Sequence, residues 1–344
     1  MKHLKLEERA SNRVLMGGWG KLLLEFGLCM SLSLGLAFSC CAQEANYPSK
    51  PIRLVVGFSP GGSADGVGRA LAENLSLRLG QPVIVENRAG ANGNIAAEMV
   101  ARAQADGYTL YFPSIGHAVN ATLYKNLSFD PVADFTAIGG VFSAPNMLVV
   151  PAKSPFHTVA QLVAFAKAHP GALTFASSGS GTSVHLSGEL FAKMAGISMV
   201  HIPYKGTGSA MPDLISGQVD MSFPNITSAL PQVNAGTLRA LGVTTAKRSN
   251  ASPQVPTMSE AGVPGYDMAT WYGLIGPANM APSIRTRLNA ELQVILANPQ
   301  FKVKLLSQGA ETMPGTALQF ENFIKSETER WRKIIEQAKI SIDQ

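Results

Sequence analysis

The sequence contains little cysteine and little charge. Three of its 344 residues are cysteine, at Cys29, Cys40 and Cys41, and 15% are charged. All three cysteines fall within the first 42 residues, so no disulfide can stabilise residues 43–344. These 302 residues must therefore be held together by a buried hydrophobic core, and they are enough for two domains of ordinary size.

Basic runs and metal-ligand clusters are also missing from residues 43–344. This part has 23 basic and 20 acidic residues, a net charge of +3, which argues against nucleic-acid binding. Its histidines form no close pairs of the spacing that metal ligands require, and it has no cysteine. We therefore expect no metal and no other cofactor.

The first 42 residues are typical of a secretory signal peptide. Five basic residues precede a mostly apolar stretch, residues 22–38, and small residues follow through Ala42. We expect cleavage after Ala42 and export of residues 43–344. The true start is either Met1 or Met16. A lipid anchor at Cys40 or Cys41 is an alternative that neither sequence context fits well, and residues 27–38 are too short to span a membrane.

A glycine-rich turn separates a strand pattern from a helix pattern early in this exported part. Residues 52–56 form an apolar run typical of a buried strand, and apolar residues recur every fourth position from Val67 to Leu79, as in a helix. Residues 58–63 lie between them and contain Pro-Gly-Gly. The unpaired N–H groups of a first helical turn, next to glycines, predict an anion site. A turn that binds no ligand is the alternative.

Other readings of this turn meet obstacles. A P-loop needs a lysine that is absent here, and the dinucleotide pattern GxGxxG fails at Leu71. Residues 57–61 match the GxSxG elbow of hydrolases, with Ser59 as the nucleophile. That mechanism takes an oxyanion donor from the next backbone N–H, and Pro60 has none. A secreted ester hydrolase that uses Ser59 therefore stays an alternative function.

Strand and helix patterns alternate through the rest of the chain. This alternation predicts an α/β fold with mostly parallel sheets covered on both faces, and ligands bind at the carboxyl ends of such strands. The strand patterns are residues 82–86, 108–112, 173–176, 199–202, 219–223, 238–244 and 271–275. The helix patterns are residues 95–105, 158–169, 186–194, 211–215, 284–296, 300–307 and 317–340.

A second small-residue loop, residues 177–183, repeats the order strand, loop, helix. Its serines and threonine add hydroxyl donors to the backbone N–H groups, so two such loops suggest a cleft that closes on one anionic ligand. His117 and His185 each follow a candidate ligand loop, and a hydrogen bond to their own loop is the alternative. Lys205 is either a solvated charge or a ligand partner. For Asp65, holding its loop is favoured over receiving a ligand ammonium group.

Seven short motifs resemble, in order and spacing, the Bug family of periplasmic solute receptors associated with tripartite tricarboxylate transport. The motifs are residues 58–65, 87–93, 106–110, 179–186, 203–206, 217–220 and 271–273. The resemblance extends from Tyr47 to the last helix pattern. It implies a type II periplasmic binding protein fold, with two mostly parallel α/β domains and a ligand cleft between them. It also implies a receptor and not an enzyme.

The resemblance implies domain limits and ligand loops as well. Domain 1 would comprise residues 43–145 and 265–344, and domain 2 residues 146–264. The implied ligand-binding residues are Phe58, Gly61, Gly62, Ser63, Asp65, Ser114, His117, Ser178, Gly179, Ser180, Gly181, Thr182, Ser183, His185, Tyr204 and Lys205. Three positions depart from the family pattern: Ala121 and Ala137 replace a usual proline, and Pro224, near the cleft, replaces a usual aspartate.

From these observations we expect a monomeric receptor in the periplasm. It would capture a small organic carboxylate by domain closure and deliver the ligand to membrane transporter subunits. A ligand-sensing receptor for a signalling partner is a further alternative. The sequence leaves the ligand open among dicarboxylates, tricarboxylates, aromatic acids, amino acids and neutral amides.

Overall fold

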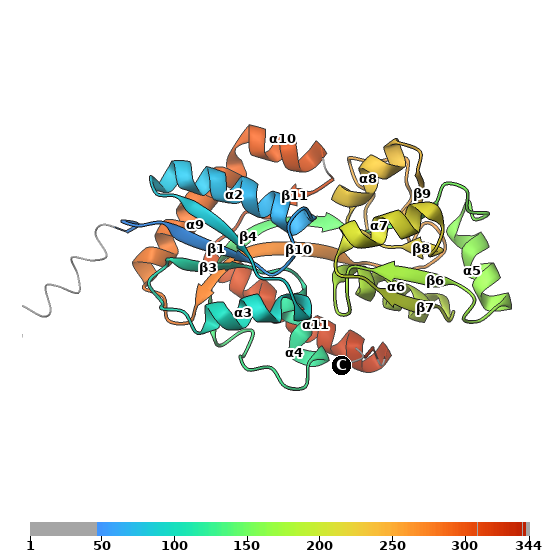
Figure 1. Cartoon of the computed structure of the whole chain (residues 1–344), viewed down its shortest axis with the longest axis horizontal. Helices are drawn as coiled ribbons and strands as arrows, with labels where there is room; N and C mark the ends of the chain where they lie inside the picture. The colour runs from blue at the N-terminus through green and yellow to red at the C-terminus, as the bar shows by residue number, and fades with distance from the viewer. Residues whose placement is uncertain (1–46, 308, 339, 342–344) are drawn as a thin grey trace, which may run out of the picture. The chain divides into compact units, whose positions relative to one another are not determined.

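The computed structural model describes residues 47–307, 309–338, 340 and 341. The expected signal peptide and its cleavage position lie outside these residues. The chain divides into two compact units, residues 1–49 and residues 50–344, and both β-sheets belong to the second unit. Figure 1 shows this second unit from blue to red along the chain.

The first sheet combines the beginning of the described chain with its last third. Its strand order is β11-β4-β10-β3-β1-β2. The strands are β1 (Ile52–Val56), β2 (Val83–Asn87), β3 (Thr109–Phe112), β4 (Phe135–Pro145), β10 (Ala269–Pro277) and β11 (Glu311–Thr312). β1 is the strand expected from the apolar run, and four of its five residues are fully buried because it lies between β2 and β3.

The second sheet uses the intervening part of the chain, in the order β7-β6-β8-β5-β9. Its strands are β5 (Met147–Pro151), β6 (Thr174–Ser177), β7 (Val200–Pro203), β8 (Met221–Ser222) and β9 (Leu238–Val243). The chain changes sheets between β4 and β5 and returns between β9 and β10. The domain limits given above stay a prediction.

The α/β class is confirmed, but each sheet is mixed where mostly parallel sheets were expected. β1 pairs in parallel with β2 and β3, and β6 pairs in parallel with β7 and β8. β10 runs antiparallel to β3 and β4, and β5 runs antiparallel to β8 and β9. Every antiparallel pair includes β4, β5 or β10, the strands beside the two sheet changes, and the β4–β5 and β9–β10 connections contain no crossover helix.

Helices cover both sheets (Figure 1). Those near the first sheet are α2 (Ser63–Leu79), α3 (Asn94–Ala101), α4 (Gly116–Leu123), α9 (Pro282–Ala297), α10 (Pro299–Ser307) and α11 (Ala317–Ala338), with the short 3₁₀ helix η1 (Ala91–Gly93). Those near the second are α5 (Val159–Ala168), α6 (Ser183–Ala195), α7 (Thr207–Ser216) and α8 (Ile226–Asn234). The sequence patterns predicted neither α4 nor α8. No helix in the described ranges is long and apolar enough to cross a membrane.

The apolar residues that recur every fourth position in α2 form the face that packs against the first sheet. Val67, Leu71, Leu75 and Leu79 are all buried, and the helix contacts β1 and β2. It ends at Gly80, whose φ of 70° suits the left-handed C-cap that glycine adopts without strain. Burial of this face fixes the opposite end of the helix, its N-terminus, beside the turn that follows β1.

A buried carboxylate joins β10 to α11 within this core. Oε2 of Glu327 accepts the indole N–H groups of Trp271 at 3.2 Å and of Trp331 at 3.3 Å. Oε1 of Glu327 pairs with Arg330 at 3.1 Å. Glu327 is 7% exposed, and both tryptophans are fully buried or nearly so. The charge is therefore compensated on both oxygens, which is the condition under which a buried carboxylate is tolerated.

Candidate functional site

The turn between β1 and α2 approaches its neighbours closely. A Cβ atom at Gly57 would lie 2.8 Å from the Cα of Gly93, so only glycine fits there. Gly61 has a φ of 85°, and Gly62 is the extended N-cap of α2 without a side-chain cap hydrogen bond. No side chain therefore caps this helix start, and the anion site expected here stays a prediction.

Asp65 holds this turn in place. Its Oδ2 accepts the N–H of Gly61 at 3.0 Å and of Arg69 Nε at 3.1 Å, and its Oδ1 accepts from Asn87 at 2.9 Å. Burial alone would raise the pKa of Asp65, but the hydrogen bonds from Arg69, Gly61 and Asn87 outweigh burial and lower it. Asn87 also donates to the carbonyl of Phe58 at 3.0 Å. The carboxylate thus stays charged and fixes both ends of the turn.

The loop between β6 and α6 has a similar glycine-rich backbone. Gly179 and Gly181 have φ values of 126° and 79°. Thr182 is the N-cap of α6: its hydroxyl accepts the N–H of His185 at 3.4 Å and donates to the carbonyl of Gly179 at 2.7 Å. The Thr182 hydroxyl is thus committed to the loop itself. Ser178 and Ser180 are half-buried.

Ser183, the first residue of α6, belongs to a buried polar network. Asn225 lies 3.4 Å from the Ser183 hydroxyl and donates to Oδ1 of Asn146 at 2.6 Å. Asn146 donates in turn to the hydroxyl of Ser187 at 3.0 Å. Asn146 is the residue between β4 and β5, so this network anchors the start of α6 at the point where the chain changes sheets.

Asn92, in η1, connects the first sheet's side of the site to the loop before α6. Its Nδ2 donates to the carbonyl of Gly181 at 2.8 Å and to Oδ1 of Asn120 at 2.9 Å. Asn92 follows a strand of the first sheet, whereas Gly181 belongs to the loop after β6 of the second. Its φ of 52° is a left-handed conformation that asparagine tolerates better than most residues. No sequence pattern indicated Asn92 or Asn120 as site residues, because the contact of Asn92 with Gly181 joins positions far apart in the sequence.

Ser114 and His117 serve local structure. The Ser114 hydroxyl accepts the N–H of Gly116 at 3.3 Å. The His117 ring is 3% exposed, lies against Phe135, and places its Nε2 2.7 Å from the carbonyl of Pro131. Burial lowers the pKa of His117 to about 4 although that hydrogen bond opposes the shift. His117 is therefore a neutral ring that fastens α4 to a neighbouring loop, and its ligand contact stays a prediction.

Tyr204 and Lys205 follow β7. The Tyr204 hydroxyl donates to Asp213 at 2.6 Å, and this hydrogen bond, more than burial, raises the pKa of Tyr204 to about 12. Lys205 is exposed, and within the described ranges it forms no salt bridge. Its ammonium group is therefore available to a ligand or to solvent.

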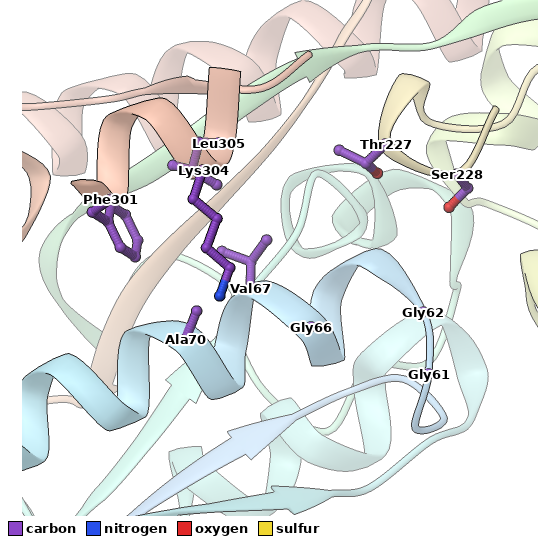
Figure 2. Close-up of a pocket in the computed structure, with 10 residues that line it drawn as sticks. All are labelled: Gly61, Gly62, Gly66, Val67, Ala70, Thr227, Ser228, Phe301, Lys304 and Leu305. Atoms are coloured by element: carbon purple, nitrogen blue, oxygen red, sulfur yellow. The ribbon is translucent and has the colours of Figure 1, made fainter. Parts of the chain in front are cut away.

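A pocket of about 340 Å³ opens beside the first turn (Figure 2). It is lined by Gly61, Gly62, Gly66, Val67, Ala70, Thr227, Ser228, Phe301, Lys304 and Leu305. Figure 2 shows Lys304 reaching from α10 toward α2, while Thr227 and Ser228 come from α8. Lys304 is the one charged residue in this set, and it is cationic. Of the sequence-predicted residues, Gly61 and Gly62 line this pocket.

The lining of α8 and α10 was missed by the sequence analysis. Lys304 lies in a predicted helix, but an exposed lysine there reads as a solvated charge. Thr227 and Ser228 begin a helix that no periodicity indicated. Asn225, its extended N-cap, is the only local signal that could have revealed it.

The chain is similar to a known protein family and to several of its members. Residues 67–340 match a family described as the tripartite tricarboxylate transporter family receptor. The protein BugT of Bordetella pertussis is 35% identical over 92% of this chain and 97% of its own. A protein from the tcbD–tcbE intergenic region of Pseudomonas sp. strain P51 is 39% identical over 95% and 96%.

Solved structures resemble this chain over most of their length. Rpa4515 of R. palustris with adipate is 37% identical, with a TM-score of 0.83 over 86% of this chain and 99% of its own. MatC of Rhodopseudomonas palustris with bound malate is 29% identical, with a TM-score of 0.79 over 84% and 100%. The periplasmic binding protein BugD is 33% identical, with a TM-score of 0.81 over 86% and 99%.

Proposed function

Because the chain belongs to the tripartite tricarboxylate transporter receptor family, we propose that it captures a small dicarboxylate and delivers it to a membrane transporter. The adipate and malate in two related structures support a carboxylate as the ligand. The family also supports a periplasmic location. Neither the ester hydrolase nor the signalling receptor has support among the relatives.

One observation carries this proposal: the two glycine-rich loops that precede helix starts lie on either side of η1, whose Asn92 donates to Gly181 of the second loop and whose Gly93 packs closely against Gly57, just before the first. The uncapped N-terminus of α2 supplies backbone N–H groups and a positive dipole end to an anion, and the serines of the loop before α6 add hydroxyl donors. No arginine lies in either loop, so the backbone takes the place of a guanidinium group. Lys304 offers a cation to a second carboxylate, which favours a dicarboxylate over a monocarboxylate.

The geometry gives Ser59 no catalytic partner. The residue is exposed, and in the portion of the chain that is described no hydrogen bond joins its hydroxyl to a histidine or carboxylate. Pro60 follows it and cannot supply an oxyanion donor. We therefore propose that ligand capture proceeds without chemistry at this serine.

A thermal-shift screen of organic acids tests the proposal. A ligand that binds only the folded form stabilises it by about 2.7 kcal/mol at a hundred times its dissociation constant. Adipate and malate serve as first probes, and hexanoate serves as the monocarboxylate. We expect at least one dicarboxylate to raise the melting temperature and hexanoate to have a smaller effect. A screen in which no organic acid stabilises the protein would contradict the receptor proposal.

The substitution Gly62→Val should abolish this stabilisation. Gly62 has a φ of −86° and a ψ of 174°, which valine adopts readily, and a Cβ there meets only the Ser59 carbonyl at 3.9 Å. The variant should therefore fold normally while its side chain occupies the ligand's approach to the turn. We expect about a hundredfold weaker binding, measured by titration calorimetry. Gly208→Val, at another uncrowded glycine, is the control. Unchanged binding by Gly62→Val would place the carboxylate elsewhere.

Replacement of Asn92 by alanine should weaken binding without preventing it. The hydrogen bond from Asn92 to Gly181 joins η1 to the loop before α6, and a neutral hydrogen bond contributes about 1 kcal/mol. We therefore expect about a fivefold rise in the dissociation constant for the responding acid. Asn126→Ala, at an exposed asparagine, should bind like the wild type. If both variants bind equally well, Asn92 does not contribute to closure.

A further inference from the structure

His185, on α6, holds the loop between β6 and α6 through a hydrogen bond. Its ring is 3% exposed, and its Nδ1 accepts the N–H of Gly181 at 3.1 Å. A ring nitrogen accepts a hydrogen bond only when it carries no proton, so the proton of the neutral ring must lie on Nε2. Nε2 faces Oε1 of Glu189 at 3.6 Å, one helical turn further along α6. The surroundings therefore select one tautomer of His185.

Gly181 is the residue through which this support reaches the first sheet. Its N–H donates to His185, while its carbonyl accepts from Asn92. A Cβ atom at this position would lie 2.9 Å from the Asn92 amide, and the φ of 79° favours glycine. The orientation of a single peptide segment thus couples the imidazole of His185 to the contact between Gly181 and Asn92.

A second histidine supports the same loop by a relay. His201, on β7, lies with its ring centroid 4.1 Å from that of His185. Its Nε2 is 2.6 Å from the Ser177 hydroxyl, which accepts the N–H of Gly179 at 3.1 Å. The two histidines therefore contact the loop glycines, His185 directly through Gly181 and His201 through the Ser177 hydroxyl beside Gly179.

Three titratable groups face one another here: His185, His201 and Glu189. Burial, and next the proximity of His185, lower the pKa of His201 to about 4. The hydrogen bond from His185 lowers the pKa of Glu189, so this carboxylate remains charged. Two imidazolium ions at this separation repel each other.

We propose that His185 is a positioning residue whose unprotonated Nδ1 holds Gly181 in the ligand-binding conformation, so that a proton on this nitrogen lowers affinity for the carboxylate. Protonated Nδ1 becomes a donor that faces the Gly181 N–H, and two donors cannot share a hydrogen bond. The peptide then loses its support, and the contact with Asn92 weakens with it. The effect on affinity rests on the proposed function. The change at the Gly181 hydrogen bond does not, because it needs no ligand.

The loop response can be measured without any ligand. The full mature chain, labelled with ¹⁵N-glycine, is titrated from about pH 7.5 to about pH 5 and the Gly181 amide signal is followed by NMR. We expect its chemical shift to move with pH in the wild type and to stay constant in His185→Asn. The asparagine Oδ1 lies near the position of Nδ1 and accepts a hydrogen bond at every pH. A Gly181 signal that ignores pH in the wild type would overturn the proposal.

Binding of the probe adipate, or of malate if adipate does not bind, supplies the second measurement. Between about pH 7.5 and about pH 5.5 we expect the affinity of the wild type to fall about tenfold more than the affinity of His185→Asn. Protonation of the acid itself affects both proteins equally, so the difference between them reports on His185. His185→Phe keeps a ring without an acceptor and should bind weakly at both pH values. His157→Asn, at an exposed histidine, should follow the wild type. Equal pH dependence in the wild type and His185→Asn would overturn the proposal, whereas failure of both acids to bind would contradict the proposed function alone.

Discussion

Acidification from about pH 7 to about pH 4 should lower the free energy of unfolding by about 3 kcal/mol through His117 alone. Burial holds the pKa of His117 at about 4 in the folded protein, against an ordinary value of 6.5 in the unfolded chain. The folded-state pKa is lowered, so the unfolded chain binds the proton first as the pH falls. This contribution to stability is complete above pH 6.5 and is lost progressively down to pH 4. His201 shifts in the same direction.

Urea unfolding at a series of pH values measures this loss. His117→Phe retains the aromatic contact with Phe135 and cannot titrate, so its stability should change less than that of the wild type between about pH 6.5 and about pH 4.5. That window lies above the range in which the carboxylates with lowered pKa titrate. His157→Phe, at an exposed histidine, should keep the wild-type slope. Parallel curves for wild type and His117→Phe would contradict a neutral, buried ring.

Replacement of Glu327 by alanine should destabilise the protein by about 4 kcal/mol. The change removes the shared acceptor of Trp271 and Trp331, which leaves two buried indole N–H groups without a partner. Each unsatisfied buried donor costs about 1–3 kcal/mol. Glu327→Gln keeps an acceptor oxygen and should cost about 1 kcal/mol, mainly through the weaker interaction with Arg330.

Equilibrium urea unfolding, with the transition followed by tryptophan fluorescence, provides the measurement. Glu329→Ala is the matched control on the same helix, because Glu329 is half-exposed and pairs with Arg332 on the surface. An exposed pair contributes at most about 1 kcal/mol. If Glu327→Ala and Glu329→Ala unfold at the same urea concentration, the indole hydrogen bonds do not contribute as the geometry indicates.

Local patterns predicted the elements whose stability is local. The apolar run at Ile52–Val56 is β1 as expected, and the capped, strongly amphipathic segment at the end of the chain is α11. Two short helices were not predicted, because their sequences resemble loops. α4 begins at the glycine of a Pro-Ser-Ile-Gly turn, and α8 contains Pro231. Local sequence patterns also could not predict whether two strands pair in parallel or antiparallel. β4 and β10 are apolar runs like β1, and their antiparallel pairing joins segments far apart in the sequence.

The candidate site shows the same division. Glycines in the two loops were visible because the turns themselves require them, and Asp65 was expected to hold its loop. The contact between Asn92 and Gly181 was not visible, since 89 positions separate the two residues. The close contact of the His185 and His201 rings depends in the same way on how α6 and β7 are placed in space. Sequence periodicity carries no information on such contacts.

The two changes of sheet also set an order in which the architecture can be completed during synthesis. Every strand of the second sheet lies between Met147 and Val243, so all of its pairings become available once residue 243 has left the ribosome. The first sheet must wait for β10, which inserts between β3 and β4, and finally for β11 at its edge. Until then β3 and β4 present unpaired edges that can join other chains. The nascent protein is thus most exposed to misassembly at the sheet that contains its own N-terminal strands.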